Sequence, residues 1–300
     1  MLDFGRLRAL VAVAEHGSMT SAAAALCCTQ PAVSRQIAAL ERQAGARLVV
    51  RTPNGARLTP VGELLVSHAR NMIDRLSRAE RQLAMLTDAG GTGLRIGSFS
   101  SANTVLLPQA IREYLRRHPR AAKPLVPTTD PEEHLTALRD GELDLALVTE
   151  WDLHGQDLDG VELIPLTEDE LLLALPETHP LANRRVRLSD LLDDTWIDGA
   201  HPDCLGPLDG LLGSFGRIPS VGIRCDDWTG KQGLVASGAG VMLFPALARL
   251  SARPDITLMH LDDEIPRRRI YLACPDGGRR VPAVASMVEL LRAAGRHYGP

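Results

Sequence analysis

Three short helical patterns in close succession within the first 45 residues constrain the fold more than any other feature. Apolar residues recur at spacings of three and four over residues 3–16, and Gly17 ends this pattern. A second helix is predicted over residues 19–26, with Ser18 as its cap, and a third begins at Thr29. Two helices of this length joined by a tight turn are typical of a helix-turn-helix.

The third helix has one apolar face and one polar face. Thr29 is well placed as its N-cap, because the proline two positions later then falls in the first turn, where its missing N–H costs nothing. The apolar stripe consists of Val33, Ile37 and Leu40. Other side chains of the first two turns, Gln30, Ser34 and Arg35, therefore project from another face. Gln can pair with adenine and Arg with guanine, whereas Ser and the helix N-terminus suit phosphate.

A hairpin is predicted directly after the third helix. Asn54-Gly55 is the strongest short hairpin signal, and a short segment with apolar residues flanks it on each side. Such a hairpin would form the wing of a winged helix-turn-helix. Arg51 and Arg57 flank its turn, where a guanidinium can enter a narrow minor groove of DNA.

A long helix is predicted to begin at Thr59-Pro60, again a cap followed by proline. Its apolar residues repeat at spacings of four and three, and they are Leu65, Ala69, Met72, Leu76, Ala79, Leu83 and Leu86. Three heptads of this pattern indicate a coiled-coil partner and therefore a dimer. The alternative is that the helix packs on its own domain.

A glycine-rich segment at residues 88–93 separates a basic head from an acidic body. Residues 1–88 carry eleven arginines and seven acidic residues, a balance of +4, whereas the whole chain carries −4. The remaining residues therefore carry −8. This asymmetry suggests that only the head meets a polyanion.

The body alternates predicted strands with predicted helices. Strands are expected at residues 94–97, 143–148, 170–175, 195–197 and 241–244, with helices up to 118 and at 131–140, 188–192 and 228–236. This alternation predicts parallel, doubly wound α/β sheets, and about 200 residues suit two lobes better than one.

Several segments resemble the LysR-type family of bacterial transcription regulators. Residues 17–26, 29–41 and 58–62 are similar to the DNA-binding head of that family, and weaker similarity continues through residues 141–147 and 236–245. The resemblance implies an α/β chain with a winged helix-turn-helix, a linker helix and two lobes like those of periplasmic binding proteins. It also adds Pro31 to the residues expected at the DNA.

The expected boundaries are DNA-binding domain 1–59, dimerisation helix 60–88 and effector domain 92–300, and the resemblance divides the last into lobe I at 92–161 and 268–300 and lobe II at 162–267. The implied partners are double-stranded DNA, a small-molecule effector and further copies of the chain, as a homodimer or homotetramer. RNA polymerase is a further candidate partner.

Candidate effector contacts lie in the body. Ser98, Ser100 and Ser101 precede a predicted helix, where hydroxyls and free N–H groups can converge on an anion. The resemblance places a ligand at this loop, so Ser100 and Ser101 are the main candidates and the effector is expected to be anionic. The other places that face the cleft in such folds are Thr128, Thr129, Thr149 and His201.

Other classes of function find little support. The sequence contains none of the common nucleotide-binding, hydrolase or zinc-protease motifs, so no catalytic residue, metal or cofactor is expected. An enzyme or solute-binding protein with a DNA-binding head stays an alternative. The lack of an export signal or a stretch of about 20 apolar residues predicts a cytoplasmic protein.

The five cysteines are expected to be reduced thiols. Cys27-Cys28 form the break between the second and third helices. A thiol redox switch using Cys204 and Cys225 is the main rival to ligand sensing, although neither has a convincing activating environment.

Overall fold

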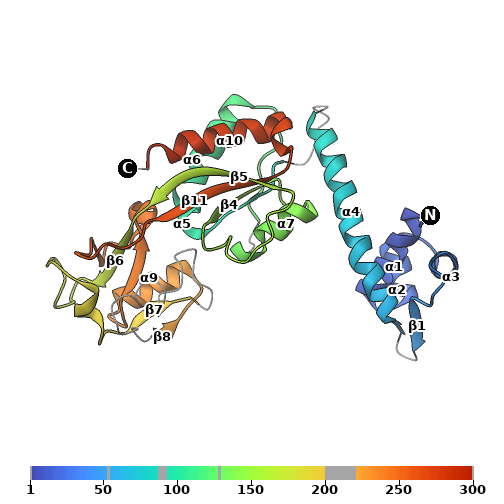
Figure 1. The fold of residues 1–300 in the computed structure, drawn as a ribbon, viewed down its shortest axis with the longest axis horizontal. Coiled ribbons are helices and arrows are strands. Elements are labelled where there is room, and N and C mark those ends of the chain that lie inside the picture. The colour runs from blue at the N-terminus through green and yellow to red at the C-terminus, as the bar shows by residue number, and fades with distance from the viewer. Residues whose placement is uncertain (1, 53–54, 87–92, 128–129, 200–220, 299–300) are drawn as a thin grey trace. The chain divides into compact units, whose positions relative to one another are not determined.

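The computed structural model describes residues 2–52, 55–86, 93–127, 130–199 and 221–298. The chain divides into two compact units, Met1–Glu80 and Arg81–Pro300. Their elements are labelled in Figure 1.

The first unit begins with three helices, α1 (Phe4–His16), α2 (Met19–Ala25) and α3 (Gln30–Ala44). Each starts at a residue that favours caps. The Asp3 carboxylate accepts from the Arg6 N–H at 3.0 Å, and the Ser18 hydroxyl accepts from the Ser21 N–H at 3.0 Å. Thr29 is the N-cap of α3, as predicted, without a side-chain capping bond. The apolar stripe of α3 is buried in the core of this unit, which confirms the orientation predicted for the helix.

The predicted wing is formed by β1 (Val49–Thr52) and β2 (Gly55–Leu58), which pair antiparallel. Its turn includes Asn54, which lies outside the described residues. The Glu41 carboxylate accepts from the N–H groups of Leu48 and Val49 at 2.9 and 3.2 Å, and the Ala56 N–H donates to the Gly17 carbonyl at 2.8 Å. The wing is thus anchored to α3 and to the turn between α1 and α2.

The long helix α4 (Pro60–Leu86) follows the wing directly. The Thr59 hydroxyl accepts from the Gly62 N–H at 3.0 Å and donates to the Arg47 carbonyl at 2.7 Å. Gly62 is required here, because a Cβ atom would lie 2.2 Å from the Leu48 carbonyl oxygen. The first turn of α4 is therefore pressed against the start of the wing.

Lobe I of the second unit contains a four-stranded sheet in the order β3-β4-β11-β5. Its strands are β3 (Ile96–Gly97), β4 (Leu145–Thr149), β5 (Val161–Asp169) and β11 (Arg268–Pro275). Its helices are α5 (Ser100–Thr104), α6 (Leu106–Arg117), α7 (His134–Asp140) and α10 (Pro282–Gly295). Helices α6 and α10 pack side by side over one core with the sheet (Figure 1).

Lobe II contains a three-stranded antiparallel sheet, β10-β6-β9, and a parallel pair, β7-β8. The strands are β6 (Leu171–Pro176), β7 (Trp196–Asp198), β8 (Val221–Arg224), β9 (Met242–Pro245) and β10 (Ile256–Met259). Helix α9 (Trp228–Ala236) packs against these strands, and short 3-10 helices lie at Leu188–Leu191 and Ala246–Ser251, with two more in lobe I at Pro131–Glu133 and Gly278–Arg280. None of the described helices has the length and hydropathy of a membrane span.

The prediction of parallel sheets is correct for two of the described strand pairs only. Only β3-β4 and β7-β8 are parallel among the described strands, because β5 and β11 pair antiparallel in lobe I and β6, β9 and β10 do so in lobe II. Strand β5 stays in the lobe I sheet up to Asp169, so the chain crosses to lobe II later than residue 161. The chain crosses from lobe I to lobe II after β5 and returns at the start of β11. Asp169 and Arg268 are Cα partners in this sheet, so these two crossing segments lie side by side.

The helix predicted after the serine loop and up to His118 is α6, whereas the short helix α5 within that loop was not predicted, and the two helices are separated by a break at Val105. The physical cause is Pro108. It has no N–H to donate to the Thr104 carbonyl, and its ring would clash with that carbonyl in a continuous helix. Helix α5 therefore ends after five residues.

Candidate DNA interface and effector site

The polar face predicted for α3 is assembled in the structure. Pro31 and Arg35 are exposed, and Gln30 and Ser34 are half-buried. Their spacing of one, three and one residues places them on adjacent positions of the first two turns. Because the apolar stripe of α3 faces the core, this polar face lies at the surface of the unit.

The wing adds one described arginine. Arg57 is exposed on β2, opposite Val50, which is itself half exposed. Arg51 lies on β1 opposite Ala56, but its side chain is outside what the structure describes.

The predicted seam of α4 divides into two parts. Ala69 is fully buried and Leu65 is half-buried, and both pack on the core of their own unit. Farther along, Met72, Leu76 and Leu83 are 45%, 44% and 61% exposed, and Ala79 is also exposed. The Leu86 side chain lies outside the described part of the chain. The alternative, in which the helix packs on its own unit, therefore applies to Leu65 and Ala69, whereas Met72, Leu76, Ala79 and Leu83 are exposed.

The serine loop after β3 presents three hydroxyls in different environments. Ser100 is exposed as the first residue of α5. Ser101 is buried, and its hydroxyl accepts from Nη2 of Arg268 at 2.5 Å. The Ser98 hydroxyl is buried and has no hydrogen-bond partner among the described residues. A buried hydroxyl of this kind costs free energy unless something else satisfies it.

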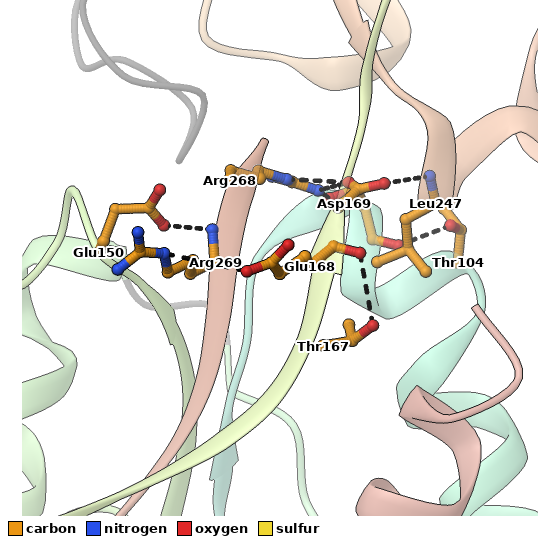
Figure 2. A network of polar contacts seen from close by, with 9 residues as sticks. Thr104, Glu150, Thr167, Glu168, Asp169, Leu247, Arg268 and Arg269 are labelled. Carbon is orange, nitrogen blue, oxygen red and sulfur yellow. Dashed lines mark hydrogen bonds and ion pairs between the residues drawn. The ribbon is translucent and has the colours of Figure 1, made fainter. Parts of the chain in front are cut away.

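Arg268 connects the serine loop to both crossings between the lobes. Its guanidinium donates from Nε and Nη2 to Oδ2 of Asp169 at 2.9 and 2.7 Å, and it stacks over the Phe99 ring at 5.1 Å. The other carboxylate oxygen of Asp169 accepts from the Leu247 N–H of lobe II at 2.8 Å (Figure 2). The side chains of Arg268 and Asp169 are almost completely buried, with 1% and 5% exposed, respectively. The network thus ties α5, the two crossing strands and lobe II together.

A second contact lies beside this network in Figure 2. The Arg269 N–H donates to the Glu150 carboxylate, just after the end of β4. Burial raises the pKa of Glu150, and the nearby hydrogen bonds and arginines oppose that effect only in part. The Glu150 carboxylate is thus held by the Arg269 N–H directly after Thr149, the last residue of β4.

The remaining effector candidates are only partly described. Thr149 is fully buried, and its N–H and hydroxyl both donate to Oδ2 of Asp152, at 2.6 and 2.9 Å. Thr128, Thr129 and His201 lie outside the described residues.

Sequence reasoning missed Arg268 and Asp169. A signal for the arginine was present, because Arg268 alternates with Arg269 and shares its face with the buried Ile270 and Leu272. Nothing local identifies Asp169, since its partner is 99 positions away.

Lobe II contains a buried lysine that the sequence did not single out. Lys231 on α9 is 2% exposed, and its Nζ lies 3.8 Å from Oδ1 of Asp198 at the end of β7. Burial lowers the pKa of Lys231 to about 8, an effect larger than the opposing attraction of the Asp198 carboxylate.

The described thiols do not form a metal or redox centre in the body. Cys274 is buried, and the half-buried Cys225 donates from Sγ to the Asp227 carbonyl at 3.6 Å. Cys204, its predicted redox partner, lies outside the described residues. Among the described residues, no group of three His, Cys, Asp or Glu side chains is arranged to hold a metal ion.

Comparison with known proteins covers both units. Residues 4–63 match the family described as "Bacterial regulatory helix-turn-helix protein, lysR family", and residues 89–296 match "LysR substrate binding domain". The chain is 29% identical over 293 residues to a probable HTH-type transcriptional regulator, LrrA, of Synechococcus elongatus, with 97% of each chain covered. It is 32% identical over 293 residues to a probable hydrogen peroxide-inducible genes activator of Mycobacterium avium, covering 95% of this chain and 92% of that one.

The fold is also that of solved full-length regulators. The structure of full-length CbnR complexed with its target DNA aligns with a TM-score of 0.69 at 22% identity, over 98% of this chain and 100% of that one. Because the two family matches together span nearly the whole sequence, this chain belongs to the LysR family of bacterial transcriptional regulators.

Proposed function

We propose that α3 is the recognition helix of this regulator and that Gln30, Pro31, Ser34 and Arg35 contact DNA. The observation that carries the proposal is the polar, solvent-facing surface of the first two turns of α3, backed by a buried apolar stripe. Recognition helices insert this part into the major groove. Arg35 suits guanine and Gln30 suits adenine, whereas Ser34 and the helix N-terminus suit phosphate.

The wing supplies a second contact with the duplex. Arg57 is exposed on β2, and Arg51 occupies the facing strand close to the same turn. The anchoring of the wing to α3 through Glu41 fixes its position relative to the recognition helix. We assign both arginines to phosphates or to a narrow minor groove.

Selection of duplexes from a random pool by the full chain tests this function. The expected result is a shared sequence with two related half-sites, because a dimer presents two copies of α3. Binding to the selected duplex should weaken linearly on a log–log plot against salt concentration, since phosphate contacts release counterions. Selected duplexes with no shared sequence would contradict sequence-specific recognition.

The exposed part of α4 is assigned to dimerisation. Met72, Leu76, Ala79 and Leu83 continue the heptad beyond the two positions that pack on the head. A Leu76→Glu/Leu83→Glu double variant should shift the protein toward smaller species in sedimentation, because it places two carboxylates in the apolar seam. Leu250→Glu is the control, since Leu250 is 84% exposed and lies in lobe II. If the double variant and the wild type sediment equally, the apolar seam of α4 does not form the dimer interface.

The effector is assigned to the ends of β3 and β4 in lobe I. Ser100 offers an exposed hydroxyl there, and the Ser98 hydroxyl lacks a partner among the described residues. Ser101 accepts from Arg268, so its own hydrogen is directed elsewhere and can be donated to an acceptor. Thr149, Thr128, Thr129 and His201 are further proposed contacts. A site rich in donors favours an anionic or strongly accepting ligand.

A thermal-shift screen of carboxylate and phosphate metabolites tests this assignment. A ligand at about one hundred times its dissociation constant should stabilise the protein by about 2.7 kcal/mol. Ser100→Ala should lose most of that shift, whereas Ser189→Ala, at an exposed position of lobe II, should keep it. Stabilisation only by uncharged apolar compounds, or an undiminished shift in Ser100→Ala, would contradict the proposed site.

With these roles the protein is a ligand-gated cytoplasmic regulator rather than an enzyme. The relatives named above are regulators, which supports the absence of catalysis. Because one relative is named as a probable hydrogen peroxide-inducible genes activator, a thiol switch stays the alternative. Cys225 is the described member of the predicted redox pair, and its thiol donates to the Asp227 carbonyl.

A further inference from the structure

Two adjacent cysteines occupy the turn of the helix-turn-helix. Cys27 and Cys28 lie between α2 and α3, and both are free and exposed. Their N–H groups donate to the carbonyls of Ala24 and Ala23 at 3.1 and 2.9 Å, which fixes the backbone of the turn against the end of α2. Cysteine is usually a buried residue, so two exposed thiols do not serve the packing of this unit.

The chemistry of this pair suits one soft centre. The Cα atoms of adjacent residues are about 3.8 Å apart, so both thiolates can reach a common atom. Thiolates are soft ligands that select soft metals and metalloids. Because the described residues hold no group of three His, Cys, Asp or Glu ligands, a four-coordinate zinc site is not formed here. The pair fits a centre that takes two thiolates and brings its own third ligand.

We propose that Cys27 and Cys28 form a two-thiol site for a trivalent, thiol-seeking metalloid or metal centre, and that an occupied site excludes DNA. With a monosubstituted arsenous acid, two As–S bonds replace two As–OH bonds. The two thiol protons leave with the two hydroxyl groups as water, and arsenic stays trivalent, so the step needs no oxidant or reductant.

The two cysteines lie next to the N-terminus of α3, and this location explains why an occupied site would exclude DNA. Cys28 directly precedes Thr29, the N-cap of α3, and Gln30 and Pro31 follow on the face assigned to DNA. A substituted arsenic atom on the turn would therefore stand at the end of the helix that enters the groove. The exclusion of DNA rests on the proposed role of α3 as the recognition helix. The binding of the metalloid to the two thiols does not depend on that role.

The test uses the full chain and phenylarsine oxide. Native mass spectrometry should detect one phenylarsenic group bound to the wild type, and 2,3-dimercaptopropanol should remove it. Cys27→Ser and Cys28→Ser should each lose this adduct, because a single thiol gives an easily hydrolysed product, whereas Cys225→Ser should keep it. The treated wild type should bind a duplex selected as above at least tenfold more weakly than the untreated protein, and the two serine variants should be unaffected by the reagent.

An adduct that persists in Cys27→Ser or Cys28→Ser would overturn the site. A wild type that carries the adduct and binds the duplex as tightly as before would overturn the exclusion of DNA. Failure of the untreated protein to bind any selected duplex would contradict the proposed function instead, and the mass measurement would still decide the thiol site.

Discussion

Arg268→Met should destabilise the C-terminal unit by about 3–5 kcal/mol, the cost of breaking a buried ion pair by removing one partner. Methionine keeps much of the side-chain length but leaves the Asp169 carboxylate, 5% exposed, without the guanidinium that donates to it twice. It also removes the donor to Ser101. Urea unfolding followed by tryptophan fluorescence measures this loss, because all three tryptophans, at positions 151, 196 and 228, lie in the C-terminal unit.

A matched control is available on the surface of the same unit. Arg253 pairs with Asp255 at 2.7 Å, but both side chains are nearly half exposed. Arg253→Met should therefore leave the free energy of unfolding nearly unchanged. Replacing both buried partners, as Arg268→Met/Asp169→Leu, should recover much of the loss because no buried charge is left uncompensated. A loss below about 1 kcal/mol for Arg268→Met alone would show that the pair does not hold the crossing between the lobes, since surface pairs contribute that little.

The stability of the C-terminal unit should contain a component from Lys231 that rises between about pH 8 and pH 10.5. Burial lowers the pKa of Lys231 from 10.5 to about 8 in the folded protein. In this pH range the unfolded chain binds more protons at this amine than the folded chain does, so the free energy of unfolding increases with pH. The full component is about 3 kcal/mol, since one unit of pKa corresponds to about 1.4 kcal/mol.

The comparison of wild type with Lys231→Met isolates this component from other groups that titrate at high pH. The difference in free energy of unfolding between the two proteins should change across the range and level off beyond it. Lys123→Met is the control, because the chain has one other lysine, Lys123, and its side chain is exposed. A difference between wild type and Lys231→Met that stays constant from pH 7 to pH 10.5 would contradict a lowered pKa at this site.

The DNA-binding head was predictable because its signals are local. Gly17 and Gly45 adopt left-handed conformations at the ends of α1 and α3, and the stripe of α3 follows from spacing alone. The helix α4 illustrates the limit. Its periodicity identified an apolar face, but periodicity cannot distinguish packing on the same unit from packing on a partner, and Leu65 and Ala69 do the former.

The body was predictable in class but not in detail. The strands β4 and β6 are short apolar segments buried along their whole length and were identified as such. The strands β5 and β11 were missed because their ends are polar and charged where they cross between lobes. The Arg268–Asp169 pair joins these two strands across 99 positions, so no local pattern could bring its members together.

The comparison of Arg35→Ala with Arg42→Ala on the selected duplex tests the central claim most directly. Both arginines are exposed on α3, but Arg35 lies in its second turn and Arg42 near its C-terminal end. Arg35→Ala should lose about 1–3 kcal/mol of binding free energy and the preference for its base, whereas Arg42→Ala should keep both. Equal binding and equal base preference in Arg35→Ala and the wild type would contradict the assignment of α3 as the helix that reads DNA.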